Sequence, residues 1–379
     1  MAQDLKHQSL IPVAMGNRWE YRESELREDG TVASTRPTSE VIRSFYDSPR
    51  GRFFYLEATD YCMWLRDTAR GLEDVMMAVD EETMTLKFDG KPGVYYRYPV
   101  EEGQTYLVDY ETEFMPVTVM TVLELKAKVQ VPAGEFTCIK YQSLDKETRL
   151  PESMHYVCPG VGLVKYETYE EGKLVTNSEL TKYQLKKEAI SDSPRMINAI
   201  MPIALGNSWT YRGTSVDADG TTVAEGPSRD VIRGMYESEA GSLYYLESDD
   251  FGLWIQNTPQ GNQDVEIVLD DETSHLKMVG KPTMYYRYPA KPGTTYDLLY
   301  GGLEEDEAYS TITVAALEEE VTVPAGIFIC VRYESHIKET GELERVEFVS
   351  PGTGLVKTEE YLDDKLTYTS VLTRYNIRN

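Results

Sequence analysis

Short runs rich in Tyr, Val, Thr and Phe, bounded by Gly, Pro and Asp, recur along the whole chain. Such runs predict β-strands, because branched and aromatic side chains suit a pleated, half-buried surface and the bounding residues suit turns. Val131–Gly134 contains a proline and a glycine and predicts the turn of a hairpin. Helical spacing is hard to find, and its best candidate is the short stretch 186–190. The clearest strands are predicted at 19–23, 40–46, 52–59, 61–66, 117–131, 135–143, 163–169 and 174–183.

The chain also repeats itself at a spacing of 190 residues. Between Pro12 and Tyr106 roughly 40 positions are identical to their counterparts between Pro202 and Tyr296, which chance does not produce. The second copy then gains two residues near Gly301, and the match resumes to the end of the chain. An insertion that small, in a glycine-rich and acidic segment, is typical of a surface loop. We therefore interpret the chain as an internal duplication.

Together, the strands and the repeat predict an all-β protein of two tandem homologous antiparallel β domains. We place the first β repeat at 9–185, a linker at 186–198 and the second β repeat at 199–379. A length of 379 residues favours two domains independently of any motif. Roughly nine to eleven strands per copy, joined by short connections, predict a curved sheet, a barrel or a half-barrel.

Composition narrows the range of partners. The formal charge is −26 and the sequence pI about 4.6, and the basic residues are scattered, so nucleic acid is excluded as a partner. No apolar run is long enough to span a membrane. The acidic residues favour solubility, with calcium or a cationic ligand as the alternative. The partner is expected to be a small molecule, a glycan or a protein.

Three motifs occur in both copies and carry a resemblance. They are Gly-Asn-x-Trp-x-Tyr from Gly16, Val-Pro-Ala-Gly-x-Phe-x-Cys from Val131, and Gly-x-Gly-Leu-Val-Lys from Gly160. The pattern resembles exported bacterial proteins of uncharacterised function. The strand layout is also distantly similar to the half-barrels of LolA-like lipoprotein carriers, which hold acyl chains. The resemblance implies a periplasmic or extracellular location. Met1–Leu10 does not read as a signal peptide, which keeps a cytoplasmic location open.

Catalysis is not expected. None of the four histidines, His7, His155, His275 and His336, has a histidine at the matching position of the other copy, and His155 aligns with Glu347. The sequence contains no nucleophile elbow, phosphate-binding loop, HExxH motif or dinucleotide fingerprint. We therefore predict a non-enzyme without catalytic residues, cofactor or metal site.

The longest motif shared by the copies is Lys-Pro-x-x-Tyr-Tyr-Arg-Tyr-Pro. Strand alternation predicts that Tyr96 and Tyr98 share one face while Tyr95 and Arg97 share the other. One face can fill the core, and the other can offer an aromatic ring beside a guanidinium to a sugar, peptide or aromatic ligand. The alternative is cross-strand packing with a structural ion pair. The candidate ligand-binding residues are Tyr96, Arg97, Tyr98, Tyr286, Arg287 and Tyr288.

The remaining motif residues are expected to be structural. Trp19, Trp64, Trp209 and Trp254 are predicted to anchor the cores, and Cys138 and Cys330 to be buried thiols. Gly160, Gly162, Gly352 and Gly354 are predicted to serve turns that need a positive φ. Cys62 and Cys158 occur only in the first copy, which makes them a candidate disulfide in an oxidising compartment.

These observations favour a non-catalytic binding or interaction protein of the bacterial envelope or exterior with two homologous β domains. The first alternative is a carrier that holds an apolar ligand inside a curved β-sheet, since ligands favour the mouths of such sheets. The second is a structural component of an assembly.

Overall fold

The computed structural model describes residues 9–80, 83–112, 117–186, 199–217, 220–238, 241–270, 275–299 and 308–378. Every regular element in these ranges is a β-strand, which confirms the all-β prediction. They contain no helix of the length and apolar character needed to cross a membrane. The predicted helical turn at 186–190 and the predicted linker at 186–198 lie, apart from Lys186, outside the described residues.

The chain divides into two compact units. Unit 1 comprises Met1–Ala78, Leu86–Ile190 and Asp271–His275, and unit 2 comprises Val79–Thr85, Ser191–Asp270 and Leu276–Asn379. The first half of the chain forms β1 (Arg18–Leu26), β2 (Val32–Ser48), β3 (Gly51–Ala58), β4 (Cys62–Thr68), β5 (Gly71–Val79), β6 (Leu86–Arg97), β7 (Thr105–Val108), β8 (Thr118–Val131), β9 (Gly134–Asp145), β10 (Pro151–Cys158), β11 (Gly162–Glu170) and β12 (Lys173–Gln184).

The second half forms the same order of strands at matching positions. They are β13 (Ser208–Val216), β14 (Thr222–Ser238), β15 (Gly241–Glu247), β16 (Gly252–Thr258), β17 (Gly261–Leu269), β18 (Leu276–Arg287), β19 (Thr295–Leu299), β20 (Ala308–Val323), β21 (Gly326–Ile337), β22 (Leu343–Ser350), β23 (Gly354–Leu362) and β24 (Lys365–Asn376). Among the described residues, each half thus has twelve strands, one more than the upper end of the predicted range. The short strands β7 and β19 are too brief to give a clear alternation in the sequence.

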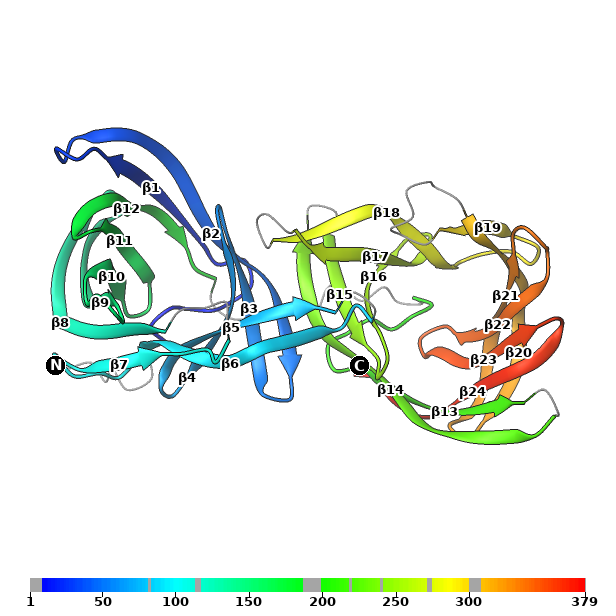
Figure 1. The fold of residues 1–379 in the computed structure, drawn as a ribbon. Helices are drawn as coiled ribbons and strands as arrows, with labels where there is room; N and C mark the ends of the chain where they lie inside the picture. The colour runs from blue at the N-terminus through cyan, green and yellow to red at the C-terminus, as the bar shows by residue number, and fades with distance from the viewer. Residues whose placement is uncertain are drawn as a thin grey trace. The chain divides into compact units, whose positions relative to one another are not determined.

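The strands of each half pair antiparallel in one continuous series, as predicted. In the second half the ladders run from β19 to β24, continue through β13 and end at β18. In the first half they run from β7 to β12 and continue through β1 to β5. Figure 1 shows the strands of each half curving around an interior. No ladder between described residues joins β18 back to β19, so the curved sheet is not closed into a barrel.

The shared motifs meet one another inside each half. The Trp19 indole N–H donates to the Val161 carbonyl at 2.6 Å, and the Tyr21 hydroxyl donates to the Leu163 carbonyl at 3.1 Å. In the second half, Trp209 and Tyr211 make the same bonds to Thr353 and Leu355, at 2.6 and 3.2 Å. The first motif therefore binds the backbone of the third motif across the curve of the sheet. The four predicted tryptophan anchors are all buried, at 1 to 5% exposure.

Glycines allow two close approaches in each half. Gly160, Gly162, Gly352 and Gly354 all have positive φ, as predicted, and a Cβ on Gly162 would lie 3.3 Å from the Trp19 indole nitrogen. Gly71, with φ +122°, packs its Cα directly on β6, so that a Cβ would lie 2.0 Å from the Tyr96 carbonyl oxygen. Gly261 meets Tyr286 in the same way. Only glycine fits there, because any side chain would collide with backbone.

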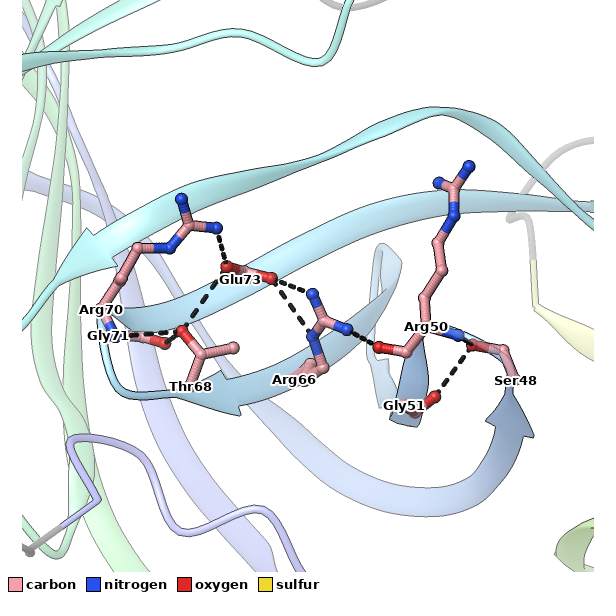
Figure 2. Close-up of polar contacts among 8 residues, drawn as sticks. All are labelled: Ser48, Arg50, Gly51, Arg66, Thr68, Arg70, Gly71 and Glu73. Atoms are coloured by element: carbon pink, nitrogen blue, oxygen red, sulfur yellow. Dashed lines mark hydrogen bonds and ion pairs between the residues drawn. The ribbon is translucent and has the colours of Figure 1, made fainter.

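A buried carboxylate holds the β4–β5 hairpin of unit 1 (Figure 2). Glu73 is 1% exposed and accepts hydrogen bonds from Arg66, from Arg70 at 2.6 Å and from Thr68 at 3.5 Å. Arg66 also donates to the Arg50 carbonyl, which ties the hairpin to the β2–β3 turn. Burial raises the pKa of Glu73, but the hydrogen bonds from the two arginines outweigh it and leave the pKa below its ordinary value.

In unit 2, none of the three charged residues of this group is present. The counterparts of Arg66, Arg70 and Glu73 are all glutamine, and the Gln256 side-chain N–H₂ donates to the Gln263 oxygen at 3.1 Å. The neutral pair occupies the same positions of the hairpin without charge, and Gln263 is half-buried where Glu73 is fully buried. Glu73→Gln alone would leave the arginines without their carboxylate, whereas exchange of the complete set would leave no charge unpaired.

This comparison predicts a non-additive effect on stability. Glu73→Gln alone should lower the free energy of unfolding by about 3 kcal/mol, because it leaves Arg66 without its carboxylate. The triple variant Arg66→Gln/Arg70→Gln/Glu73→Gln should recover most of that loss. Chemical denaturation of the full-length variants measures both values. A triple variant as unstable as the single one would contradict the interpretation.

Candidate functional site

Each unit contains a partly open cavity, and these two cavities occupy matching positions of the repeat. Cavity 1, in unit 1, has a volume of about 400 Å³, and cavity 2, in unit 2, about 550 Å³. Of the residues that line cavity 1, only Trp19, Glu23 and Ser39 lack a counterpart in the wall of cavity 2. The shared apolar wall of cavity 1 consists of Ile11, Leu56, Met63, Leu65 and Leu163, which correspond to Met201, Leu246, Leu253, Ile255 and Leu355 in cavity 2.

The shared tyrosine motif supplies two residues to each cavity, but not the two that alternation predicts. Tyr95 and Tyr96 both line cavity 1, and Tyr285 and Tyr286 both line cavity 2. The prediction that Tyr95 faces away from Tyr96 is therefore wrong. The β17–β18 register shifts where Asn262 pairs with Tyr286, and the shift leaves Tyr285 as an extra residue. Such a bulge turns two successive side chains toward the same side of the sheet.

Arg97 and Tyr98 lie outside the wall of cavity 1, as do Arg287 and Tyr288 for cavity 2. The Arg97 guanidinium stacks on the Tyr106 ring at 4.5 Å, and Arg287 stacks on Tyr296 at 4.9 Å. The predicted pairing of an aromatic ring with a guanidinium therefore exists. Both groups belong to the protein, and they stack on each other outside the cavities. Of the six candidate ligand-binding residues, the cavities include Tyr96 and Tyr286.

A carboxylate and two tyrosines form one polar side of cavity 1. Glu40 lies 3.0 Å from the Tyr21 hydroxyl, whose single proton it shares with the Leu163 carbonyl, and accepts a hydrogen bond from the Tyr61 hydroxyl. Burial raises the pKa of Glu40, while the two hydroxyls act against that rise. Asp230 and Phe251 take the places of Glu40 and Tyr61 in cavity 2, so its carboxylate has one tyrosine fewer beside it.

His155 forms another polar part of the wall of cavity 1. It is 1% exposed, and its Nδ1 and Nε2 lie 2.6 Å from the Tyr96 and Ser153 hydroxyls respectively. Burial lowers the pKa of His155 to about 3, so the ring is neutral at physiological pH. A neutral imidazole has one donor and one acceptor nitrogen, and each hydroxyl can complement one of them. Both nitrogens are therefore occupied by the fold.

Cavity 2 has a carboxylate where cavity 1 has this histidine. Glu347 is 7% exposed and accepts a hydrogen bond from the Tyr286 hydroxyl at 3.1 Å. Burial raises the pKa of Glu347, and the nearby Arg345 opposes that rise. Burial also raises the pKa values of Asp230 and Asp264 to about 6. Further carboxylates in the wall belong to Glu225, Asp249, Asp250 and Glu360, and Arg345 is the single Lys or Arg among its described residues.

The part of the chain that the structure describes contains no group of three or more His, Cys, Asp or Glu arranged to hold a metal ion. The candidate disulfide is not present either. Cys62 is a thiol that hydrogen-bonds with Tyr55, and Cys158 lies beside Cys138 instead of Cys62. Cys138 and Cys330 are fully buried, as predicted.

Sequence reasoning missed Glu40, Tyr61 and His155 as members of one site. Their spacing along the chain carries no motif, and only the curve of the sheet brings β2, β4 and β10 together. One signal was present, since His155 and Glu347 are aligned and differ in charge. This difference argues against a catalytic histidine shared by the two halves, and it also makes the two cavity walls differ in charge.

The buried histidine predicts a pH effect on stability. His155 has its ordinary pKa of 6.5 when unfolded and about 3 when folded. Below pH 6.5 the unfolded chain binds a proton that the folded protein does not, so stability falls toward pH 3 by about 1.4 kcal/mol per pH unit. His155→Gln should remove this slope, and the two proteins should show parallel curves above pH 7. Denaturation across pH 4.5–8 measures the difference, and parallel curves throughout would contradict it.

Comparison with known proteins finds no family model and no curated protein that matches the chain. Among solved structures, a "putative exported protein with YmcC-like fold" from Bacteroides fragilis is similar over 47% of this chain and 100% of that chain, at 14% identity and a TM-score of 0.30. A "putative lipoprotein" from Parabacteroides distasonis covers 48% and 100%, at 15% identity and a TM-score of 0.28. A protein of unknown function from the DUF3598 family, from Nostoc punctiforme, covers 98% of both chains, at 11% identity and a TM-score of 0.17. These are distant structural neighbours, and we base no functional argument on them.

Proposed function

We propose that the protein is a non-catalytic binding protein that holds one small molecule in each of its two cavities. The observation that carries this proposal is the match between the cavities, whose walls use the same positions of the repeat. Both volumes lie in the range of ligand sites in proteins. Protein interiors are otherwise close-packed, so an unfilled volume of this size marks a candidate ligand site in each half.

Cavity 1 suits a molecule with an apolar body and a neutral polar end. Leu56, Met63 and Leu65 offer an apolar surface, while the Tyr95 ring and the Tyr61 hydroxyl lie at the polar side. His155 is neutral and already hydrogen-bonded, so it favours no charged group on the ligand. This arrangement supports the earlier alternative of a carrier for a largely apolar ligand.

Cavity 2 suits a related molecule that carries a positive charge. Its wall holds seven carboxylates against one arginine, whereas the wall of cavity 1 holds three carboxylates. A cation in a partly desolvated, carboxylate-lined cavity is stabilised far more than in water. The two halves therefore offer the same cavity with different electrostatics.

We also propose that the protein is located in the bacterial envelope or outside the cell. It is motivated by the resemblance of the three repeated motifs to exported proteins. Cell fractionation of the native organism with an antibody against the chain tests it. Recovery only in the cytoplasm would remove the location and leave the cavity proposal intact.

The first binding prediction concerns stoichiometry. A neutral fluorophore that brightens in apolar surroundings, such as N-phenyl-1-naphthylamine, should bind twice per chain. Met63→Trp fills cavity 1 and Leu253→Trp fills cavity 2, so each should remove one site, weakening it at least about tenfold. Fluorescence titration and isothermal calorimetry measure both sites.

Two control variants separate this model from the alternative site. Leu107→Trp adds the same ring at a position that is 55% exposed and outside the cavity wall, and should change nothing. Arg97→Ala should also leave the affinity within about twofold, because Arg97 stacks on Tyr106 outside the cavity. If Arg97→Ala abolishes binding while Met63→Trp does not, the ligand binds at the surface formed by Arg97 and Tyr106 instead of in cavity 1.

The second prediction concerns charge. Glu347→His gives cavity 2 the residue of cavity 1, and should weaken a cationic amphiphile such as dodecyltrimethylammonium by about tenfold. The reciprocal His155→Glu should strengthen that probe in cavity 1. Wild-type affinity should also fall between pH 7 and pH 5, because Asp230 and Asp264 then take up protons. Equal binding of neutral and cationic probes at every pH would contradict the assignment.

A further inference from the structure

Cys138 and Cys158 stand directly opposite each other on neighbouring strands. The β9–β10 ladder pairs Lys140 with Tyr156 and Ile139 with Val157, so the same register places Cys138 opposite Cys158. Residues directly opposite in an antiparallel ladder have Cα atoms about 4.5–5.5 Å apart, within the range that a disulfide spans. The two thiols also hydrogen-bond with each other.

We propose that Cys138 and Cys158 are a redox-active pair that closes to a cross-strand disulfide when a small-molecule disulfide, such as oxidised glutathione, acts as oxidant. The pair replaces the Cys62–Cys158 disulfide that the sequence suggested. Thiol groups that face each other on paired strands need no backbone movement to bond.

The surroundings assign each sulfur a role. Cys158 is half-buried, and a hydrogen bond from Cys138 lowers its pKa, which favours the thiolate that attacks. Cys138 is fully buried, and that hydrogen bond together with burial raises its pKa. Cys158 is therefore the thiol that reacts first with an outside disulfide, and Cys138 is the thiol that resolves it.

The reaction balances with oxidised glutathione as the only co-reactant. Cys158 Sγ, after losing its proton to water, attacks one glutathione sulfur, the glutathione S–S bond breaks, and one glutathione leaves as thiolate. Cys138 then loses its proton, and its Sγ attacks Cys158 Sγ and releases the second glutathione. Two protein thiols are oxidised by two electrons, and one oxidised glutathione becomes two reduced molecules.

The second half of the chain provides the contrast. Its β21–β22 ladder pairs Val331 with Val349, which places Cys330 opposite Ser350. The pair is therefore specific to unit 1. There it would fix β9 to β10, the strand that also carries His155 of cavity 1.

The test uses the full chain, reduced and freed of reductant. It is incubated with oxidised glutathione in native buffer, and unreacted thiols are then alkylated. Intact mass and non-reducing peptide mapping should show two of the four thiols lost and one peptide pair joined through Cys138 and Cys158. The melting temperature of the oxidised protein should rise, because the bond closes a loop of the unfolded chain.

Four variants make the outcome decisive. Cys158→Ser, which copies Ser350, should keep all of its remaining thiols, whereas Cys62→Ser should still form the bond. Cys138→Ser should stop at a mixed disulfide of Cys158 with one glutathione. Ser350→Cys should add a second bond, between Cys330 and the introduced thiol, so that four thiols are lost. A bond that includes Cys62, or four thiols that all remain alkylatable, would overturn the proposal. Neither result would affect the binding proposal.

Discussion

Hydrogen bonds from two side chains of the first strand to the backbone of the eleventh hold each half in its curve. Trp19 and Tyr21 donate to carbonyl groups of Val161 and Leu163, which lie 142 residues further along the chain. A buried indole N–H or phenol O–H without an acceptor would cost about 1–3 kcal/mol, so these bonds fix where β1 can lie relative to β11. Glycine at position 162 is what lets the indole approach. β1 also pairs with β12, which in turn pairs with β11, so the backbone ladders and these side-chain bonds give β1 the same place.

The cavities follow from the same constraint. A sheet curved in this way encloses more space than the side chains of the described wall fill, and the tyrosines of β6 and β18 line what is left. The donors Trp19 and Tyr21 have identical counterparts in Trp209 and Tyr211, while several polar residues of the cavity walls differ. Cavity 1 has His155 where cavity 2 has Glu347, and the tryptophan and tyrosine bonds are the same in both halves. The residues that hold the curve of the sheet can therefore stay the same while the polar residues of the cavity change.

Much of the strand arrangement and of the core was predictable from the sequence. The strand runs, the hairpin turn at Val131–Gly134 and the tryptophan anchors all depend on local pattern, and the structure confirms them. The cavity was not predictable, because its polar groups come from strands that are far apart in the chain. Tyr285 was misplaced because alternation assumes an unbroken ladder. The bulge that turns Tyr285 and Tyr286 toward cavity 2 is set by the β17–β18 backbone register, which the side-chain pattern does not encode.

The three glutamines of unit 2 show how the two halves differ at one hairpin. Arg66, Arg70 and Glu73 satisfy one another, and so do the two glutamines that bond in their place. A hybrid hairpin that holds glutamine in place of Glu73 beside Arg66 or Arg70 leaves an arginine with no counter-charge. A crossover within 66–73 that joins the first half to the second creates this hybrid. Chimeras built to move one cavity into the other half should carry that hairpin whole.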